Sequence, residues 1–138
     1  MLVDTCCGSG TILIEAAMMA RNIAPGLNRS FAAMKWDWIP ESLWKEERKK
    51  AFQEVDYDGE LLIKGFDIDE RAVEAARENA EEAGVGDDIR ISKMDMKKFR
   101  AEEDHGIIIT NPPYGERIGD DEKIQKIKSR RADSQSCS

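Results

Sequence analysis

Four short apolar runs alternate along this chain with longer helical patterns, and each run ends in polar or glycine-rich residues. The runs fall near residues 2–4, 61–67, 89–93 and 107–110. Such alternation is typical of a parallel sheet, because parallel strands need a crossover segment between them. We therefore expect an α/β fold with helices on both faces of the sheet. Right-handed crossovers, with all four strand ends at one edge, predict the strand order 3-2-1-4.

The two helical patterns between the expected strands differ in character. Residues 11–24 are apolar on nearly every side, which predicts a buried helix that stops at Pro25. Residues 70–83 carry alanines along one face, with Asp69 as a candidate N-cap and Gly84 as a natural residue after the last turn.

Residues 27–59 form an insertion between the first helix and the second strand. It contains an aromatic stretch from Phe31 to Trp38 and an amphipathic helix from about residue 41 to 55. Since three tryptophans in one insertion can simply pack, we expect them to dock the insertion on the domain.

Composition limits the classes of function that need to be considered. The 138 residues suit one domain, and the net charge of −7 makes the chain a poor non-specific binder of nucleic acid by itself. If nucleic acid is the substrate, affinity must come from a local basic patch or from another domain. No apolar run approaches a membrane span, and the start lacks the basic residues of a signal peptide, so we expect a cytoplasmic protein. Three cysteines and the lone His105 form no zinc or disulfide pattern, and no metal is expected.

Polar residues at the strand ends are the candidates for a site. In open parallel sheets, ligands bind outside the carboxyl ends of the strands, where the strand order reverses. The candidates are Asp4, Cys6, Gly8, Ser9 and Gly10 in the first loop, Asp67 and Ile68 after the second strand, Asp95 and Met96 after the third, and Asn111, Pro112, Pro113 and Tyr114 after the fourth.

The first loop differs from the common phosphate-binding loops. Counted from Gly8, a dinucleotide fingerprint would need glycine at Leu13, and no Gly-Lys-Ser/Thr follows for a Walker loop. Its glycines instead let a ligand approach the backbone ahead of a helix N-terminus, which favours a carboxylate.

The acids after the second and third strands suit a nucleoside. Asp67 suits two ribose hydroxyls and Asp95 an adenine amine, with Ile68 and Met96 as apolar walls for the ring. Carboxylate, ribose and adenine together describe S-adenosylmethionine better than a pyrophosphate cofactor. The alternative is that Asp67 and Asp95 are turn residues, and that Asp69 is only a helix cap.

The patterns DTCCGSGT, GFDID and NPPYGERIG resemble the class I methyltransferases that modify exocyclic amines. Within that group the chain is most similar to the bacterial THUMP-containing methylases of guanine N2 in 23S rRNA, formerly labelled N6-adenine DNA methylases. NIAPGLNRSFAAMKW, residues 22–36, is the specific part of this resemblance. The resemblance implies a partial methyltransferase domain over 1–123, without the THUMP region and the later strands, and a disordered or foreign tail over 124–138.

The resemblance also implies roles for the candidates. S-adenosylmethionine would contact Asp4, Cys6, Gly8, Gly10, Asp67 and Asp95, while residues 111–114 hold the target base. Asn111 and the Pro112 carbonyl would each accept an N–H of the target amine, and Tyr114 would stack on a base lifted from its helix. Adenine-N6 methylation of DNA or RNA, methylation of a protein glutamine, and a non-catalytic cofactor- or RNA-binding fragment remain alternatives.

Overall fold

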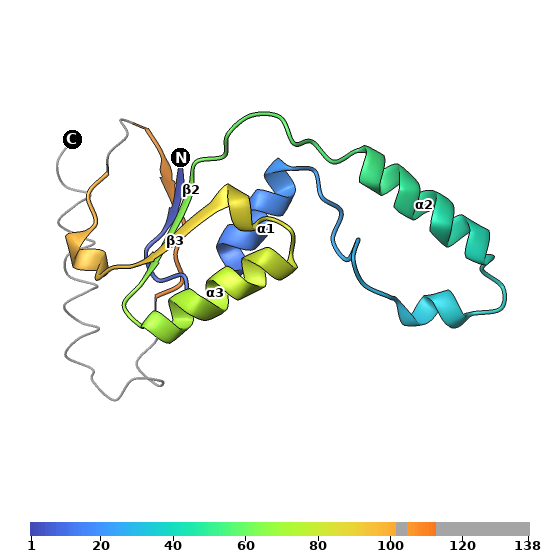
Figure 1. The fold of residues 1–138 in the computed structure, drawn as a ribbon, viewed down its shortest axis with the longest axis horizontal. Coiled ribbons are helices and arrows are strands. Elements are labelled where there is room, and N and C mark those ends of the chain that lie inside the picture. Colours follow the sequence, from blue (N-terminus) through green and yellow to red (C-terminus); the bar gives the residue numbers. More distant parts are fainter. Residues whose placement is uncertain (102–104, 113–138) are drawn as a thin grey trace.

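The computed structural model describes residues 1–101 and 105–112, and its centre is a parallel sheet of four strands (Figure 1). The strand order is β3-β2-β1-β4, as predicted from right-handed crossovers. In register, Leu2 pairs with Ile63 on one side and with Ile107 on the other. The strands are β1 (Leu2–Asp4), β2 (Ile63–Asp67), β3 (Ile89–Lys93) and β4 (Ile107–Ile108).

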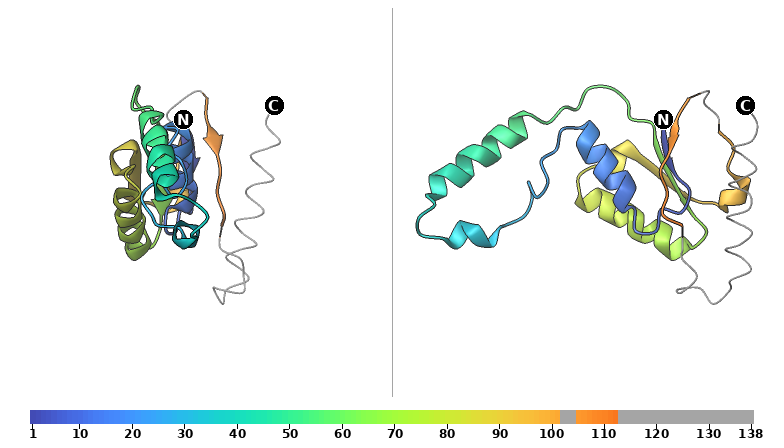
Figure 2. Two further views of the ribbon diagram at one scale, coloured as in Figure 1. Left: turned by 90° about the vertical axis from the view of Figure 1, so that its right-hand side faces the viewer. Right: turned by 180° about the vertical axis from the view of Figure 1, so that it is seen from behind.

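Helices α1 (Thr11–Ala20) and α3 (Glu70–Glu82) cover the same face of the sheet (Figures 1 and 2). The steps from β1 to β2 and from β2 to β3 run in one direction, so right-handed crossovers put both helices on one side. The step back from β3 to β4 begins with a short 3₁₀ helix, η3 (Met96–Lys98). Among the described residues, η3 is the helical element beyond the other face, where Phe99 packs on Phe66 with ring centroids 5.7 Å apart.

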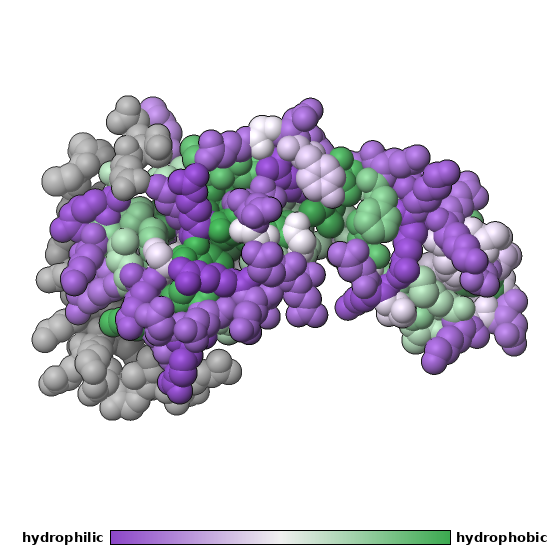
Figure 3. Space-filling model, viewed as in Figure 1, coloured by the Kyte–Doolittle hydropathy of each residue, from purple (hydrophilic) through white to green (hydrophobic). Residues whose placement is uncertain are grey.

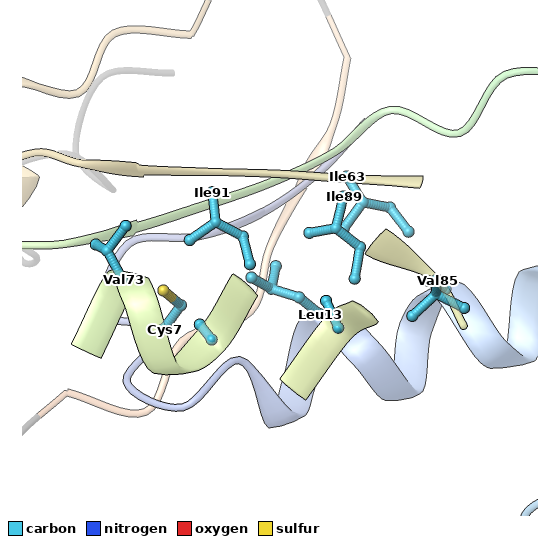
Figure 4. Close-up of a cluster of buried hydrophobic side chains, with 10 residues drawn as sticks. Cys7, Leu13, Ile63, Val73, Val85, Ile89 and Ile91 are labelled. Atoms are coloured by element: carbon cyan, nitrogen blue, oxygen red, sulfur yellow. The ribbon is translucent and has the colours of Figure 1, made fainter. Parts of the chain in front are cut away.

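The core lies between the sheet and the two helices (Figure 4). Leu13 of α1 and Val73 of α3 are fully buried there against isoleucines of β2 and β3. Gly65 of β2 allows the close approach of α1, because a Cβ at this position would lie 2.2 Å from Cδ1 of Leu13. The chain therefore places a glycine at a close contact between helix and strand.

The ends of α3 agree with the sequence, whereas α1 is shorter than predicted. Asp69 caps α3 by accepting the N–H of Arg71 at 3.0 Å, and Gly84 follows the helix with a φ of 77°. Helix α1 ends at Ala20 because Asn22 adopts a left-handed φ of 53° and the N–H of Ile23 returns to the Met18 carbonyl at 2.8 Å. That pattern is a Schellman motif, which closes the helix before Pro25.

The insertion projects from the sheet and its helices, contrary to the expectation that it docks on the domain (Figures 1 and 2). It carries a 3₁₀ helix, η1 (Ala32–Lys35), and α2 (Glu41–Gln53). Its aromatic rings pair with one another instead, since Phe31 stacks on Trp44 with centroids 6.0 Å apart. Ion pairs between side chains on neighbouring turns also stabilise α2 locally, independently of contacts with the core. Within the described residues, no helix is long and apolar enough to cross a membrane.

Candidate functional site at the carboxyl edge

The loops that follow β1, β2 and β3 are joined by hydrogen bonds at the carboxyl edge of the sheet. The N–H of Cys7 donates to the Phe66 carbonyl at 2.9 Å, and the N–H of Met94 donates to the Asp67 carbonyl at 2.9 Å. The N–H of Gly8 donates to Oδ2 of Asp67 at 3.0 Å. These contacts bring the predicted first loop and the second strand end together, with Asp67 between them.

Asp67 is partly buried, and both of its carboxylate oxygens are engaged. While Oδ2 accepts the N–H of Gly8, Oδ1 accepts the N–H of Asp69 at 3.0 Å. Each carboxylate oxygen has a second lone pair, so these bonds leave acceptor capacity for hydroxyl groups of a ligand. The predicted contact with ribose remains a prediction, and the structure adds that Asp67 also fixes the first loop.

The first loop takes a shape that glycine makes accessible and that α3 supports. Gly8 and Gly10 have positive φ angles of 53° and 83°. A Cβ at Gly10 would lie 3.1 Å from Cβ of Ala76, and the Asn79 side chain donates to the Ser9 carbonyl at 2.9 Å. Helix α1 begins directly after this loop without a side-chain cap. Its N-terminus therefore offers backbone N–H groups to an anion such as a carboxylate.

Asp4 shapes the start of this loop from within the protein. Its side chain is only 1% exposed, and Oδ1 accepts the N–H of Cys6 at 3.0 Å. In this structure Asp4 therefore organises the turn rather than facing the edge, and its predicted contact with the cofactor stays a prediction. The next residue, Thr5, reaches Thr110 with 3.5 Å between the hydroxyl oxygens, which links the first loop to the end of β4. Sequence reasoning missed both threonines, although each directly adjoins a predicted site segment.

The third strand end is tied to the first loop by sulfur atoms. Sγ of Cys6 lies 3.8 Å from Sδ of Met96. Asp95 starts η3 by accepting the N–H of Lys97 at 3.0 Å, so the turn role considered for it is present. Ile68, on the second strand end, is 67% exposed. Its exposure leaves it free to contact a ligand. Its role as an apolar wall for the adenine ring remains a prediction.

The fourth strand end is described as far as Pro112. Asn111 is exposed and Pro112 is partly buried, and both directly follow Thr110 beside the first loop. Pro113 and Tyr114, which are also candidates for holding a base, lie outside the described residues.

The two cysteines of the first loop both have raised pKa values. Burial raises the pKa of the Cys6 thiol, and burial together with Asp67 and Asp4 raises the pKa of Cys7 to about 12. Both thiols are thus protonated near neutral pH, and the thiolate is the reactive form. Across residues 1–101 and 105–112, no group of three or more His, Cys, Asp or Glu could hold a metal ion.

Relatives with known names match nearly the whole chain. The "Putative RNA methyltransferase YpsC" of Bacillus subtilis (strain 168) is 47% identical over 91% of this chain and 32% of its own length. The "Ribosomal RNA large subunit methyltransferase K/L" of Shewanella baltica (strain OS155) is 42% identical over 91% of this chain and 18% of its own length. The chain thus spans a third or less of these curated relatives.

Solved structures share the fold. The crystal structure of SMU.472 complexed with SAH is 48% identical, with a TM-score of 0.84 over 89% of this chain and 33% of that one. A predicted N6-adenine-specific DNA methylase from Listeria monocytogenes is 46% identical, with a TM-score of 0.85 over 91% of this chain and 33% of that one. The predicted class I methyltransferase fold is therefore confirmed.

The family follows from a match that covers nearly all of the sequence. A family model described as UPF0020, RMKL-like, methyltransferase domain, matches residues 1–136. The match takes in most of the segment 124–138, which the sequence alone predicts to be disordered or foreign. The chain belongs to the UPF0020 family of RMKL-like methyltransferase domains.

Proposed function

We propose that the protein containing this chain transfers a methyl group from S-adenosylmethionine to an exocyclic amine of a nucleic-acid base, with guanine N2 of 23S rRNA as the preferred target. The observation that carries the proposal is the junction at Asp67, which binds the glycine loop to the second strand end beside the uncapped start of α1. Family membership and the similarity to a structure complexed with SAH point the same way.

The residues at the edge fit S-adenosylmethionine part by part. The N-terminus of α1 and the backbone of Gly8 and Gly10 would hold its carboxylate, because uncapped N–H groups and the helix dipole favour negative charge. Asp67 would accept from the ribose hydroxyls, and Asp95 from the adenine amine, with Ile68 and Met96 beside the ring. When bound, the cofactor supplies an electrophilic methyl group on a sulfonium.

Asn111 and Pro112 would prepare the target amine. An exocyclic amine is a weak nucleophile, because its lone pair is delocalised into the ring. The Asn111 side-chain oxygen and the Pro112 carbonyl can each accept one N–H, which draws the nitrogen toward a tetrahedral shape and frees the lone pair. Since the prolines fix these acceptors beforehand and offer no competing N–H, positioning supplies most of the catalysis. We propose that Tyr114 stacks on the base and that Pro113 keeps the segment rigid.

The choice among substrates rests on the names of the relatives. Two similar proteins are named for RNA or ribosomal RNA, whereas the Listeria monocytogenes relative is named for adenine in DNA. Because the Asn-Pro-Pro-Tyr segment suits any planar NH₂ group, adenine N6 is the second candidate. An rRNA substrate implies a cytoplasmic protein and, given the net charge of −7, an additional RNA-binding domain.

Methyl transfer by the full-length protein tests the proposal. We expect single-turnover transfer of labelled methyl from S-adenosylmethionine to 23S rRNA, and a rate about 100- to 1000-fold lower in Asn111→Ala, by analogy with the loss of one oxyanion-hole donor. Cofactor affinity should change little, because Asn111 acts on the amine.

Ser30→Ala is the matched control, since Ser30 is an exposed residue of the insertion. Transfer to adenine-containing DNA but not to rRNA would replace the first candidate by the second. Cofactor binding without transfer to either would refute a nucleic-acid base as the target, and wild-type turnover in Asn111→Ala would refute the mechanism.

A further inference from the structure

The peptide group between Ser9 and Gly10 is held at both of its polar atoms. Its carbonyl oxygen accepts a hydrogen bond from the Asn79 side chain at 2.9 Å, and its N–H donates to the Cys7 carbonyl at 2.8 Å. Because a peptide group is planar, fixing these two atoms fixes the plane of the whole group. This group directly precedes Thr11, the first residue of α1. A residue of α3, 70 positions further along the chain, therefore helps to set how α1 begins.

Helix α3 also supports this peptide group by packing, which is a separate contact from the Asn79 bond. Gly10 is buried, and a Cβ at this position would lie 3.1 Å from Cβ of Ala76. Ala76 and Asn79 are three residues apart in α3 and are therefore neighbours on one side of the helix. Figure 3 shows mainly hydrophilic residues along α3, and Asn79 is one of its exposed positions. The packing of Gly10 on Ala76 thus holds the loop against α3, while the Asn79 bond fixes the direction of one peptide group.

The start of α1 brings together hydrogen-bond donors that α1 itself does not use. The first N–H groups of a helix have no partner within it, and α1 has no side-chain cap. The hydroxyl oxygens of Ser9 and Thr11 lie 3.2 Å apart at the same place. These donors can meet one anion together only if the preceding peptide group gives the helix start the right direction. A donor set that is fixed before binding lowers the ordering that the ligand must supply.

We propose that Asn79 is a positioning residue for the carboxylate of S-adenosylmethionine. It bonds to the glycine loop and acts through the Ser9–Gly10 peptide group on the donors at the start of α1. The inference rests on the proposed function for the identity of the ligand. Its expected effect differs from that of Asp67, which would contact the ribose. Losing the Asn79 bond weakens the hold on the carboxylate end of the ligand alone.

Two ligands that differ only in the carboxylate test this role in the full-length protein. Titration calorimetry compares S-adenosylmethionine with its decarboxylated form, which keeps the adenosine, the sulfonium and the amino group. We expect Asn79→Ala to raise the dissociation constant of S-adenosylmethionine about 2- to 12-fold, the range for one neutral hydrogen bond, and to leave that of the decarboxylated form unchanged. The melting temperature should change little, because alanine is a better helix former than asparagine and the packing of Gly10 on Ala76 remains.

Glu78→Ala is the matched control, because Glu78 is the preceding exposed residue of α3 and has no hydrogen bond to the first loop among the described residues. We expect this control to keep both affinities. Equal losses for the two ligands in Asn79→Ala would mean general damage to the site and would overturn the positioning role, as would unchanged affinity for both.

The same experiment separates this inference from the proposed function. If the selective loss is seen but the wild type transfers no methyl group to rRNA or DNA, the proposed reaction is refuted and the role of Asn79 stands. A wild-type protein that binds neither ligand would overturn both.

Discussion

Replacing Asp67 by alanine tests whether this residue contributes to cofactor binding as well as to the shape of the first loop. The substitution removes the acceptor of two backbone N–H groups, those of Gly8 and Asp69, each held at 3.0 Å. If ribose hydroxyls use the remaining lone pairs, the ligand loses charge-assisted hydrogen bonds as well. Such bonds contribute about 1.5–3 kcal/mol, so the dissociation constant for S-adenosylmethionine should rise about 10- to 150-fold.

Titration calorimetry with S-adenosylmethionine measures this effect, with circular dichroism to show that the variant is folded. Asp69→Ala is the matched control, because Asp69 lies two residues away, caps α3 and makes no bond to the glycine loop within the described residues. We expect the control to lower the melting temperature slightly and to keep cofactor affinity. Unchanged affinity in a folded Asp67→Ala protein would remove Asp67 from the site.

Two further predictions concern the core behind the site. Gly65→Ala should lower the free energy of unfolding by about 1–3 kcal/mol in urea titrations, because the new Cβ would clash with buried Leu13. Unchanged stability would contradict this and would mean that α1 can shift away from β2 at no cost. Burial, with Asp67 and Asp4 nearby, raises the pKa of Cys7 to about 12 from an ordinary value of 9.0. The contribution of this thiol to stability is therefore present below about pH 9 and is lost as the pH rises toward 12. Cys7→Ala should therefore show a shallower alkaline loss of stability than the wild type, and parallel curves would refute this assignment.

The strands of the sheet could be predicted from the sequence because the residue patterns that mark each strand are local. Apolar runs that end in glycine or proline mark the strands, and the handedness of crossovers then leaves few arrangements. The cap at Asp69 and the turn at Gly84 follow from residue type alone. The meeting of the candidate residues at the carboxyl edge could be predicted as well, since parallel strands have their carboxyl ends on the same side of the sheet.

The projection of the insertion and the finer contacts of the site could not be predicted in this way. Helical spacing shows that Trp44 and its neighbours share a face, but not whether that face packs on the core or on Phe31 of the same insertion. The end of α1 depends on the left-handed backbone conformation of Asn22. The apolar pattern continues past this residue and so gives no sign that the helix ends before it. The bridge from Thr5 to Thr110 joins residues 105 positions apart and has no periodic signal.

The double engagement of Asp67 also bears on how a site of this kind works. Because the carboxylate already holds the N–H groups of Gly8 and Asp69, the glycine loop has its shape before any ligand arrives. The packing of Gly10 against Ala76 and the bond from Asn79 to Ser9 restrain the same loop from α3. Ordering of the loop is thus achieved during folding, and binding does not have to supply it. The shape of the glycine loop is thus set by contacts from two neighbouring elements of the fold, β2 and α3.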